Sequence, residues 1–233
     1  MIKIPVYAIF VAGGSGSRMG STTPKQFLEL GGIPILQRSV EGFLEARPEA
    51  KVIIVLPQRN IGTWKELCLK YAASFPQTLV EGGMTRFHSV LNALGKVPDG
   101  VIVSVHDAVR PLATPALIGN MLEQMRAPGR PDCLIPVVPV TDTLRSMAEG
   151  IPSPDRSTLA AVQTPQMFRS EVLKKAYRQP YDTSFTDDAS VAERAGFRVS
   201  TTPGERFNIK ITTPKDISLG QSIYERRHKE ENV

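Results

Sequence analysis

The 233-residue sequence contains only two cysteines, Cys68 and Cys133. They lie far apart and outside any CxxC pattern, so we expect two reduced core thiols, not a disulfide, a redox pair or a metal site. No uninterrupted apolar run approaches the roughly 18 residues needed to span a bilayer. The first ten residues also lack the small-residue cleavage site of a secretory signal. We therefore expect a cytoplasmic protein without a membrane partner.

Aromatic residues are scarce as well, at 6% of the chain. They are not interleaved with basic residues, as stacking platforms for nucleic acids would be. The net charge of +5 comes from lysines and arginines scattered among acids, and the one dense basic run, at 226–229, is followed directly by glutamates. This distribution predicts no nucleic-acid partner and fits small phosphorylated substrates better.

Two common nucleotide-binding motifs are missing. Lys25 follows Pro24, whereas a Walker-type P-loop needs Gly-Lys-Ser or Gly-Lys-Thr. A dinucleotide-binding G-x-G-x-x-G fails because Met19 stands in place of the third glycine, and there is no Tyr-x-x-x-Lys pair. NAD binding is therefore disfavoured. The three histidines show no metal-ligand spacing and are expected to be structural or exposed: His88, His106 and His228.

What the sequence does contain is an alternation of β-rich apolar runs and helical apolar spacing. Strands are predicted at 4–11, 51–56, 78–80, 101–105 and 197–202, and helices at 35–43, 63–73, 115–125, 171–177, 189–195 and 214–227. This order predicts one α/β domain over 1–233, with a mainly parallel central sheet and ligands at the carboxyl ends of its strands.

The segment 136–163 breaks this alternation. Its two apolar stretches, at 137–144 and 157–162, flank a turn rich in glycine, proline and serine at 150–154. We predict a β-hairpin arm that protrudes from the domain.

A glycine-rich segment ends the first predicted strand. Its free backbone amides are suited to holding phosphate oxygens, although a plain strand-to-helix connection would use glycines too. Arg18 and Lys25 follow in the same stretch and favour a polyphosphate clamp. Lys210 lies between two isoleucines on a predicted strand. If its amine faces inward, burial is costly unless an anion such as a phosphate binds it. The alternative is a lysine on an edge strand that points to water.

Asp107 comes directly after the strand at 101–105. Mg²⁺ binds through one or two carboxylates, with phosphates and water completing its shell, so Asp107 is the candidate metal ligand. The alternative is a turn cap paired with Arg110. The neighbouring phosphate clamp favours the metal site.

Taken in order, seven segments resemble one family. They are Ala12-Gly-Gly-Ser-Gly-Ser-Arg-Met-Gly, Pro24-Lys-Gln-Phe-Leu, Gly82-Gly, His106-Asp-Ala-Val-Arg-Pro, Gln163-Thr-Pro-Gln, Thr186-Asp-Asp-Ala and Asn208-Ile-Lys-Ile-Thr. This family is the 2-C-methyl-D-erythritol 4-phosphate cytidylyltransferases of the non-mevalonate isoprenoid pathway. The likeness extends over essentially the whole chain. It implies a Rossmann-like nucleotidyltransferase sandwich, Mg²⁺ or another divalent cation as cofactor, and a homodimer whose arms complete the partner's active site.

The resemblance also implies a role for each matching residue. Arg18, Lys25 and Lys210 would stabilise charge on the triphosphate and the transition state, and Asp107 would hold the metal. The CTP pocket would use Ala12, Gly13, Gly14, Gly16, Gly82, Gly83, Ser89 and Ala108. The sugar-phosphate site would use Arg110, Thr164 and Thr186 of one subunit with Thr143 and Arg156 of the other.

This sequence departs from the family's pattern in two places. The arm is shorter than in some members, and Phe207 stands where an acidic residue is common. Two other functions stay open: a ribitol 5-phosphate cytidylyltransferase with the same fold and CTP site, and a nucleotide-binding regulatory protein without turnover. The second would be expected to lose a clamp cation, and all three are present.

Overall fold

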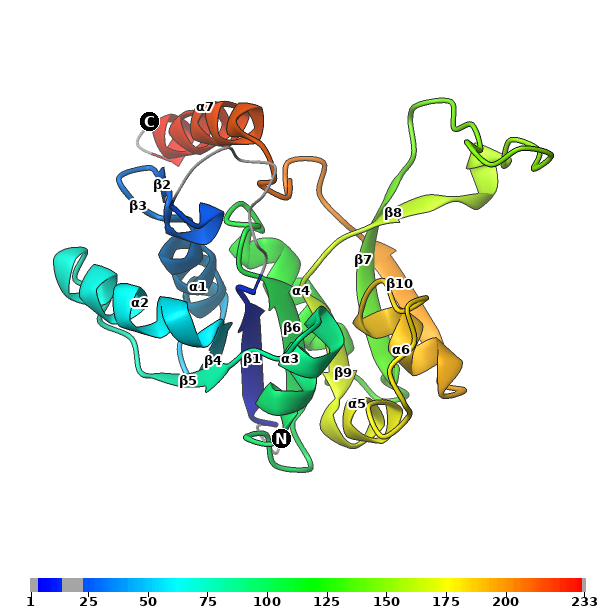
Figure 1. The fold of residues 1–233 in the computed structure, drawn as a ribbon, viewed down its shortest axis with the longest axis horizontal. Coiled ribbons are helices and arrows are strands. Elements are labelled where there is room, and N and C mark those ends of the chain that lie inside the picture. Colours follow the sequence, from blue (N-terminus) through cyan, green and yellow to red (C-terminus); the bar gives the residue numbers. More distant parts are fainter. Residues whose placement is uncertain (1–3, 14–22, 232–233) are drawn as a thin grey trace.

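The computed structural model describes residues 4–13 and 23–231. An eight-stranded sheet forms its centre, in the order β10-β7-β9-β6-β1-β4-β5, with β8 pairing with β7 outside this path (Figure 1). The strands of this sheet are β1 (Val6–Val11), β4 (Lys51–Leu56), β5 (Gln77–Glu81), β6 (Ile102–Asp107), β7 (Cys133–Pro139), β8 (Ala160–Val162), β9 (Gln166–Arg169) and β10 (Val199–Pro203).

The sheet is mixed and mostly parallel. The pairs β1–β4, β1–β6, β4–β5 and β7–β10 are parallel. Strand β9 lies antiparallel between β6 and β7, and β8 is antiparallel to β7. The strand pattern of the sequence predicted the parallel part, whereas β9 and the beginning of β7 were not predicted.

Helices cover both faces of the sheet. They are α1 (Ile35–Ala46), α2 (Gln58–Lys70), α3 (Arg86–Leu94), α4 (Pro115–Gln124), α5 (Ser170–Ala176), α6 (Asp188–Arg194) and α7 (Pro214–Glu231). Side chains of α1, α2 and α4 pack on one face, with Phe10 and Ile54 of the sheet. Side chains of α3, α5 and α6 pack on the other face, with Ile9 and Val105. Because side chains alternate along a strand, β1 contributes Ile9 and Phe10 to opposite layers.

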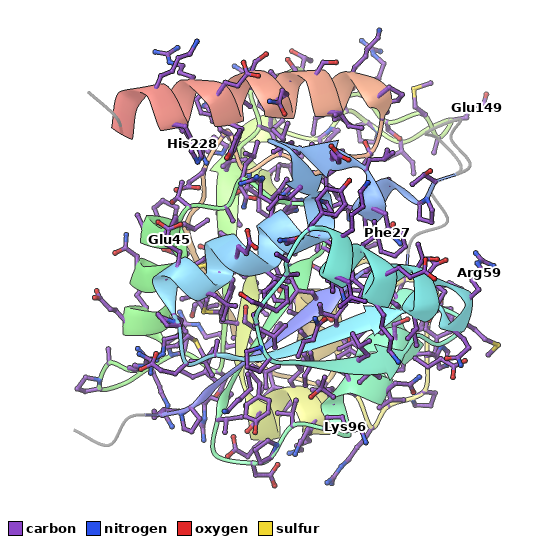
Figure 2. All side chains as sticks on the ribbon, turned by 90° about the vertical axis from the view of Figure 1, so that its left-hand side faces the viewer. Phe27, Glu45, Arg59, Lys96, Glu149 and His228 are labelled. Carbon is purple, nitrogen blue, oxygen red and sulfur yellow. The ribbon has the colours of Figure 1, made fainter. Side chains whose placement is uncertain are left out.

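A smaller cluster lies beyond the carboxyl ends of the strands. The short strands β2 (Glu29–Leu30) and β3 (Ile33–Pro34) form a two-stranded sheet that follows the 3₁₀ helix η2 (Lys25–Phe27). Leu30 and Ile35 pack there with Leu112, Ile211 and Ile223 of α7. Seen from the side, α7 runs across the top of the molecule above α1 (Figure 2). This cluster anchors both chain segments that carry the predicted clamp lysines.

Most predicted elements are present, with shifted ends. The helix predicted at 63–73 is α2, which begins at Gln58, directly after Pro57, and ends at Lys70. Trp64 is its fully buried residue. The strand predicted from residue 4 begins at Val6, after Pro5. The strand predicted around Lys210 is wrong: 208–213 forms no strand, and the backbone N–H of Ile211 instead donates to the carbonyl oxygen of Val109 at 2.8 Å.

The arm protrudes beside the sheet, but only its base is a β-ladder (Figure 1). Val137, Val138 and Pro139 pair with Val162, Ala161 and Ala160. Beyond this ladder, the one regular element of the arm is the 3₁₀ helix η3 (Arg156–Thr158). The longer strands predicted at 137–144 and 157–162 are therefore wrong. Prolines at 139, 152 and 154 lack the N–H that a ladder needs, which explains the irregular backbone.

Both cysteines are free, as predicted, and Cys133 is buried. Among the helices of the described residues, none is long and apolar enough to cross a membrane.

Candidate active site

The carboxyl ends of β1, β5 and β6 converge on one cleft. Val11 at the end of β1 pairs with Asp107 at the end of β6. The backbone N–H of Ala12 donates to the carbonyl oxygen of Val55, and that of Gly82 donates to the carbonyl oxygen of Leu56. Strand β4 therefore connects the ends of β1 and β5. The sequence predicted a ligand site at these strand ends, because ligands of open parallel sheets bind there.

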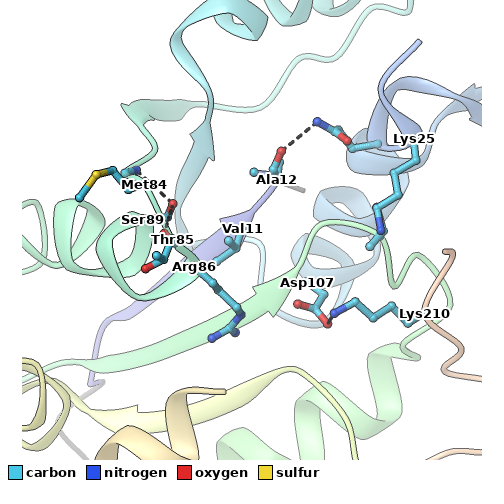
Figure 3. Close-up of a pocket in the computed structure, with 13 residues that line it drawn as sticks. Val11, Ala12, Lys25, Met84, Thr85, Arg86, Ser89, Asp107 and Lys210 are labelled. Atoms are coloured by element: carbon cyan, nitrogen blue, oxygen red, sulfur yellow. Dashed lines mark hydrogen bonds and ion pairs between the residues drawn. The ribbon is translucent and has the colours of Figure 1, made fainter. Parts of the chain in front are cut away.

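The cleft has two adjoining regions, which we call the glycine side and the threonine side. The glycine side is lined by Val11, Ala12, Gly13, Lys25, Gln26, Gly83, Met84, Thr85, Arg86, Ser89, Asp107, Val109 and Lys210 (Figure 3). The threonine side is lined by Arg86, Asp107, Arg110, Val162, Gln163, Thr164, Gln166, Thr186, Asp187 and Lys210. Three charged residues line both: Arg86, Asp107 and Lys210.

Asp107 is the electrostatic centre of this junction. Its Oδ2 atom lies 2.9 Å from Lys210 Nζ and 3.2 Å from Arg110 Nε. Burial alone would raise the pKa of Asp107, but the charges of Lys210, Arg86 and Arg110 outweigh it and hold the pKa well below its usual range. The carboxylate is therefore ionised at neutral pH. The amine of Lys210 reaches Asp107 from a loop and is 43% exposed, so the buried strand lysine expected from the sequence is wrong, and its phosphate partner stays a prediction.

A buried histidine supports this carboxylate from behind. His106 Nε2 lies 3.2 Å from the carbonyl oxygen of Arg110, so this nitrogen carries the proton and donates. His106 Nδ1 then accepts from the Thr164 hydroxyl at 2.9 Å, and the same hydroxyl accepts from the Asp107 N–H at 3.0 Å. Burial lowers the pKa of His106 to about 4, so the ring is neutral at pH 7. His106 is structural, as predicted, and Thr164 helps to position Asp107.

The glycine side is shaped by contacts between Gly83 and the first turn of α3. A Cβ on Gly83 would lie 2.4 Å from His88 Cβ, so no side chain fits there. The Ser89 hydroxyl accepts from the Gly83 N–H at 3.1 Å and donates to the Thr85 carbonyl at 2.9 Å. Gly13 and Ser89 face each other, since a Cβ on Gly13 would lie 3.8 Å from Ser89 Oγ.

Lys25 is held at the cleft by its neighbour. Gln26 is buried, and its side-chain amide donates to the carbonyl oxygen of Ala12 at 2.8 Å. This bond ties η2 to the end of β1, which places Lys25 on the glycine side (Figure 3). Gln26 was not predicted as a site residue, although it stands within the Pro-Lys-Gln-Phe-Leu segment.

The loop that carries Lys210 is tied to the base of the arm. The side-chain amide of Gln163 donates to the Glu205 carbonyl at 2.7 Å and accepts from the Glu205 N–H at 3.1 Å. Asn208 is fully buried and donates to the Thr164 carbonyl at 2.9 Å, while its own carbonyl accepts from Arg110 at 2.8 Å. These bonds fix Arg110 and the Lys210 loop on the same wall.

The structure brings together most of the predicted residues that it describes. Those that line the cleft are Ala12, Gly13, Lys25, Gly83, Ser89, Asp107, Arg110, Thr164, Thr186 and Lys210. Gly82 and Ala108 adjoin it without lining either region. Thr143 and Arg156 lie on the arm, where Arg156 donates to the Thr141 carbonyl at 2.6 Å, and line neither region of this chain. Gly14, Gly16 and Arg18 lie outside the described residues.

Sequence reasoning missed Arg86. This residue opens α3 directly after its N-cap, Thr85, and its Nη2 atom lies 2.5 Å from Oδ2 of the fully buried Asp188. The sequence held one signal. A cation in the first turn of a helix is unfavourable with respect to the helix dipole, so an arginine at that position indicates a role other than helix stability. The Thr186-Asp-Asp segment also gains a structural reading, since Asp187 caps α6 and Asp188 anchors Arg86.

The described residues of the cleft form no preformed metal cage. Among the described residues, no group of three or more His, Cys, Asp or Glu side chains could hold a metal ion. One ionised carboxylate at the junction nevertheless fits Mg²⁺, which takes few protein ligands and completes its shell with phosphate oxygens and water.

Known proteins resemble this chain over most of its length. The family model described as 2-C-methyl-D-erythritol 4-phosphate cytidylyltransferase matches residues 6–226. The chain belongs to this cytidylyltransferase family. The enzyme of that name from Porphyromonas gingivalis is 46% identical over 219 residues, covering 93% of this chain and 96% of the relative. Its counterpart from Bacteroides thetaiotaomicron is 44% identical over 219 residues, covering 92% and 97%.

Solved structures of the cytidylyltransferase family share the fold. The 4-diphosphocytidyl-2C-methyl-D-erythritol synthase of Anaerococcus prevotii superposes with a TM-score of 0.79 at 25% identity and covers 95% of this chain and 96% of its own. The family enzyme of Francisella tularensis gives 0.77 at 27% identity, covering 93% and 98%. The family and the fold class predicted from the motifs are therefore confirmed.

Proposed function

We propose that this protein transfers CMP from CTP to 2-C-methyl-D-erythritol 4-phosphate, giving 4-diphosphocytidyl-2-C-methyl-D-erythritol and pyrophosphate for isoprenoid precursor synthesis. Family membership is the first support. The observation that carries the proposal is the shared wall of the cleft, where Asp107 and Lys210 line both the glycine side and the threonine side. A reaction between two phosphates needs such a common charged boundary.

The chemistry is a single displacement. A phosphate oxygen of the acceptor attacks the α-phosphorus of CTP, the new P–O–P bridge forms, and the bond to the β-phosphate breaks as pyrophosphate leaves with its electron pair. No covalent enzyme intermediate is needed. Lys25 and Lys210, with Arg18 outside the described residues, stabilise the charge that gathers on the five-coordinate phosphorus.

Asp107 would hold the divalent cation in this proposal. Despite its burial, the charges of Lys210, Arg86 and Arg110 lower the pKa of Asp107 and keep it ionised at neutral pH. When bound, Mg²⁺ neutralises triphosphate charge and orients the phosphates. The glycine side takes the cytidine, because the close approach of Gly83 to His88 and of Gly13 to Ser89 leaves backbone groups to face the base.

The threonine side takes the methylerythritol phosphate, with Arg110, Thr164 and Thr186 on this wall. Arg156 and Thr143 of one subunit complete the site of the other in a homodimer. Two features support this assembly: neither residue lines a cleft region of its own chain, and the arm exposes apolar side chains, with Met147 94% and Ile151 60% exposed. In this view the chain is a single domain that contributes the segment 136–163 as a dimerisation arm.

The test is pyrophosphate release by the purified protein with CTP and Mg²⁺. Methylerythritol phosphate is compared with ribitol 5-phosphate, and CTP with ATP, GTP and UTP. Release restricted to CTP and methylerythritol phosphate is expected. A higher kcat/KM for ribitol phosphate would reassign the acceptor, and no release with any pair would leave a nucleotide-binding protein without turnover.

A further inference from the structure

Arg86 is a cation of the cleft to which the proposed chemistry assigns no task. It comes from the first turn of α3, lines both sides of the cleft and extends toward Asp107 (Figure 3). The helix dipole disfavours a cation in the first turn of a helix, so helix stability does not explain this position.

The guanidinium is fixed from one side. Asp188 is fully buried and accepts from Arg86 Nη2 at 2.5 Å with Oδ2, while its Oδ1 accepts from the Tyr177 hydroxyl at 2.6 Å. Phe87, the next residue, stacks on Tyr177 with 4.6 Å between ring centroids. The start of α3 is therefore fixed against the end of α5 and against α6, and the arginine cannot swing away without leaving the buried Asp188 carboxylate without its cation.

The rest of the guanidinium is available. Arg86 has five N–H donors, and the bond to Asp188 is its one hydrogen bond among the described residues. Its side chain is 29% exposed where it lines the cleft. Burial alone would lower the pKa of Arg86, but the charges of Asp188 and Asp107 outweigh it and raise the pKa, so the group is a permanent cation.

We propose that Arg86 binds a phosphate ester at the junction of the two sides of the cleft, as a substrate-contacting residue of the transfer reaction. The inference rests on the proposed function. Donors left over from the Asp188 pair form a pre-oriented fork, which is the geometry that phosphate oxygens favour. Two phosphates meet at this junction: the α-phosphate of CTP and the phosphate of the acceptor.

The experiment separates a direct contact from a structural role by pairing two variants. Arg86→Gln removes the cation but leaves the Asp188 charge buried with the Tyr177 hydroxyl as its remaining partner, whereas Arg86→Gln with Asp188→Asn removes both charges. Arg169→Gln is the matched control, because Arg169 forms a 3.2 Å ion pair with Asp132 and lines neither side of the cleft. Each protein is assayed for kcat and KM with both substrates, for melting temperature, and for CTP affinity by calorimetry without acceptor.

We expect Arg86→Gln to lower kcat/KM about 100-fold or more, the effect of removing one donor to a charged transition state. Arg86→Lys, which keeps the charge without the fork, should lose about tenfold. The double variant should regain the melting temperature of the wild type but not its activity. Arg169→Gln should stay within about twofold of the wild type.

The binding measurement identifies the phosphate. Weaker CTP affinity in both Arg86→Gln proteins assigns the contact to the nucleotide, while unchanged CTP affinity with a lower kcat/KM for the acceptor assigns it to the sugar phosphate. Recovery of full activity in the double variant would overturn the proposal, as would unchanged kinetics in Arg86→Gln. If the wild type releases no pyrophosphate, the proposed function fails separately, and unchanged CTP affinity in the variants then overturns this inference as well.

Discussion

Stability should depend on pH through His106, one of three histidines in the chain. This ring is 1% exposed and neutral in the folded protein, with its pKa lowered by burial to about 4. In the unfolded chain a histidine titrates near about 6.5. Between these values the unfolded state binds a proton that the folded state does not, so stability is complete above pH 6.5 and falls as the pH drops toward 4.

The size of the effect follows from the two pKa values. A difference of one pKa unit corresponds to about 1.36 kcal/mol, and at pH 4 the folded ring is half protonated while the unfolded one is fully protonated. The loss between pH 7.5 and pH 4 is therefore about 3 kcal/mol from this residue alone. For a domain of this size that lowers the melting temperature by roughly 6–12 °C.

The comparison that isolates His106 is with His106→Gln, a residue that has no charge to gain. Urea unfolding followed by circular dichroism, at fixed protein concentration and at several pH values, gives the pH slope of each protein. The slope is the readout, because the substitution changes absolute stability at every pH. We expect the wild type to lose about 3 kcal/mol more than the variant between pH 7.5 and pH 4. Equal slopes would refute the assignment of a buried, neutral ring.

Three further predictions concern the site. Lys25→Ala and Lys210→Ala should each lower kcat by about 100-fold or more with the fold retained, since the cations act on the transition state; an unchanged kcat in steady-state assays would remove that lysine from the mechanism. Arg156→Ala should raise KM for the sugar phosphate more than for CTP, and equal changes would argue against its place beside the acceptor. Gly83→Ala should destabilise the protein by about 1–3 kcal/mol, because its Cβ would lie 2.4 Å from His88 Cβ. The control is Gly62→Ala in α2, where a Cβ meets nothing within 4 Å and should stabilise by roughly 0.5–1 kcal/mol.

The sequence predicted the parts of the site that follow from local chemistry. Asp107 lies at the sheet's carboxyl edge as expected, although the strand predicted at 101–105 extends through it to residue 107. Gly13 and Gly83 were placed by the same reasoning and by the family's motifs. The positions of these residues depend only on the local apolar pattern that marks each strand and on where that strand ends.

Other features depend on contacts between distant segments. Strand β9 could not be predicted from its own residues, because Gln166–Arg169 is short and owes its place to pairing with β6 and β7. Lys210 was expected on a strand, but its loop is held by Gln163 and by the Val109–Ile211 bond, neither of which leaves a periodic pattern. Arg86 was missed because its partner, Asp188, is 102 residues away in the sequence.

The distant contacts hold several cations at one cleft. Lys25, Arg86, Arg110 and Lys210 line it as cations, whereas Asp107 and Asp187 are the acids among its described lining residues. Like charges held close together cost free energy, and a partly buried excess of cations is retained only where anions arrive to balance it. The tethers supplied by Gln26, Gln163 and Asp188 hold the cations against their mutual repulsion. Binding of a triphosphate relieves that repulsion, so CTP should raise the melting temperature of the protein even without an acceptor, and more steeply at low ionic strength than at high.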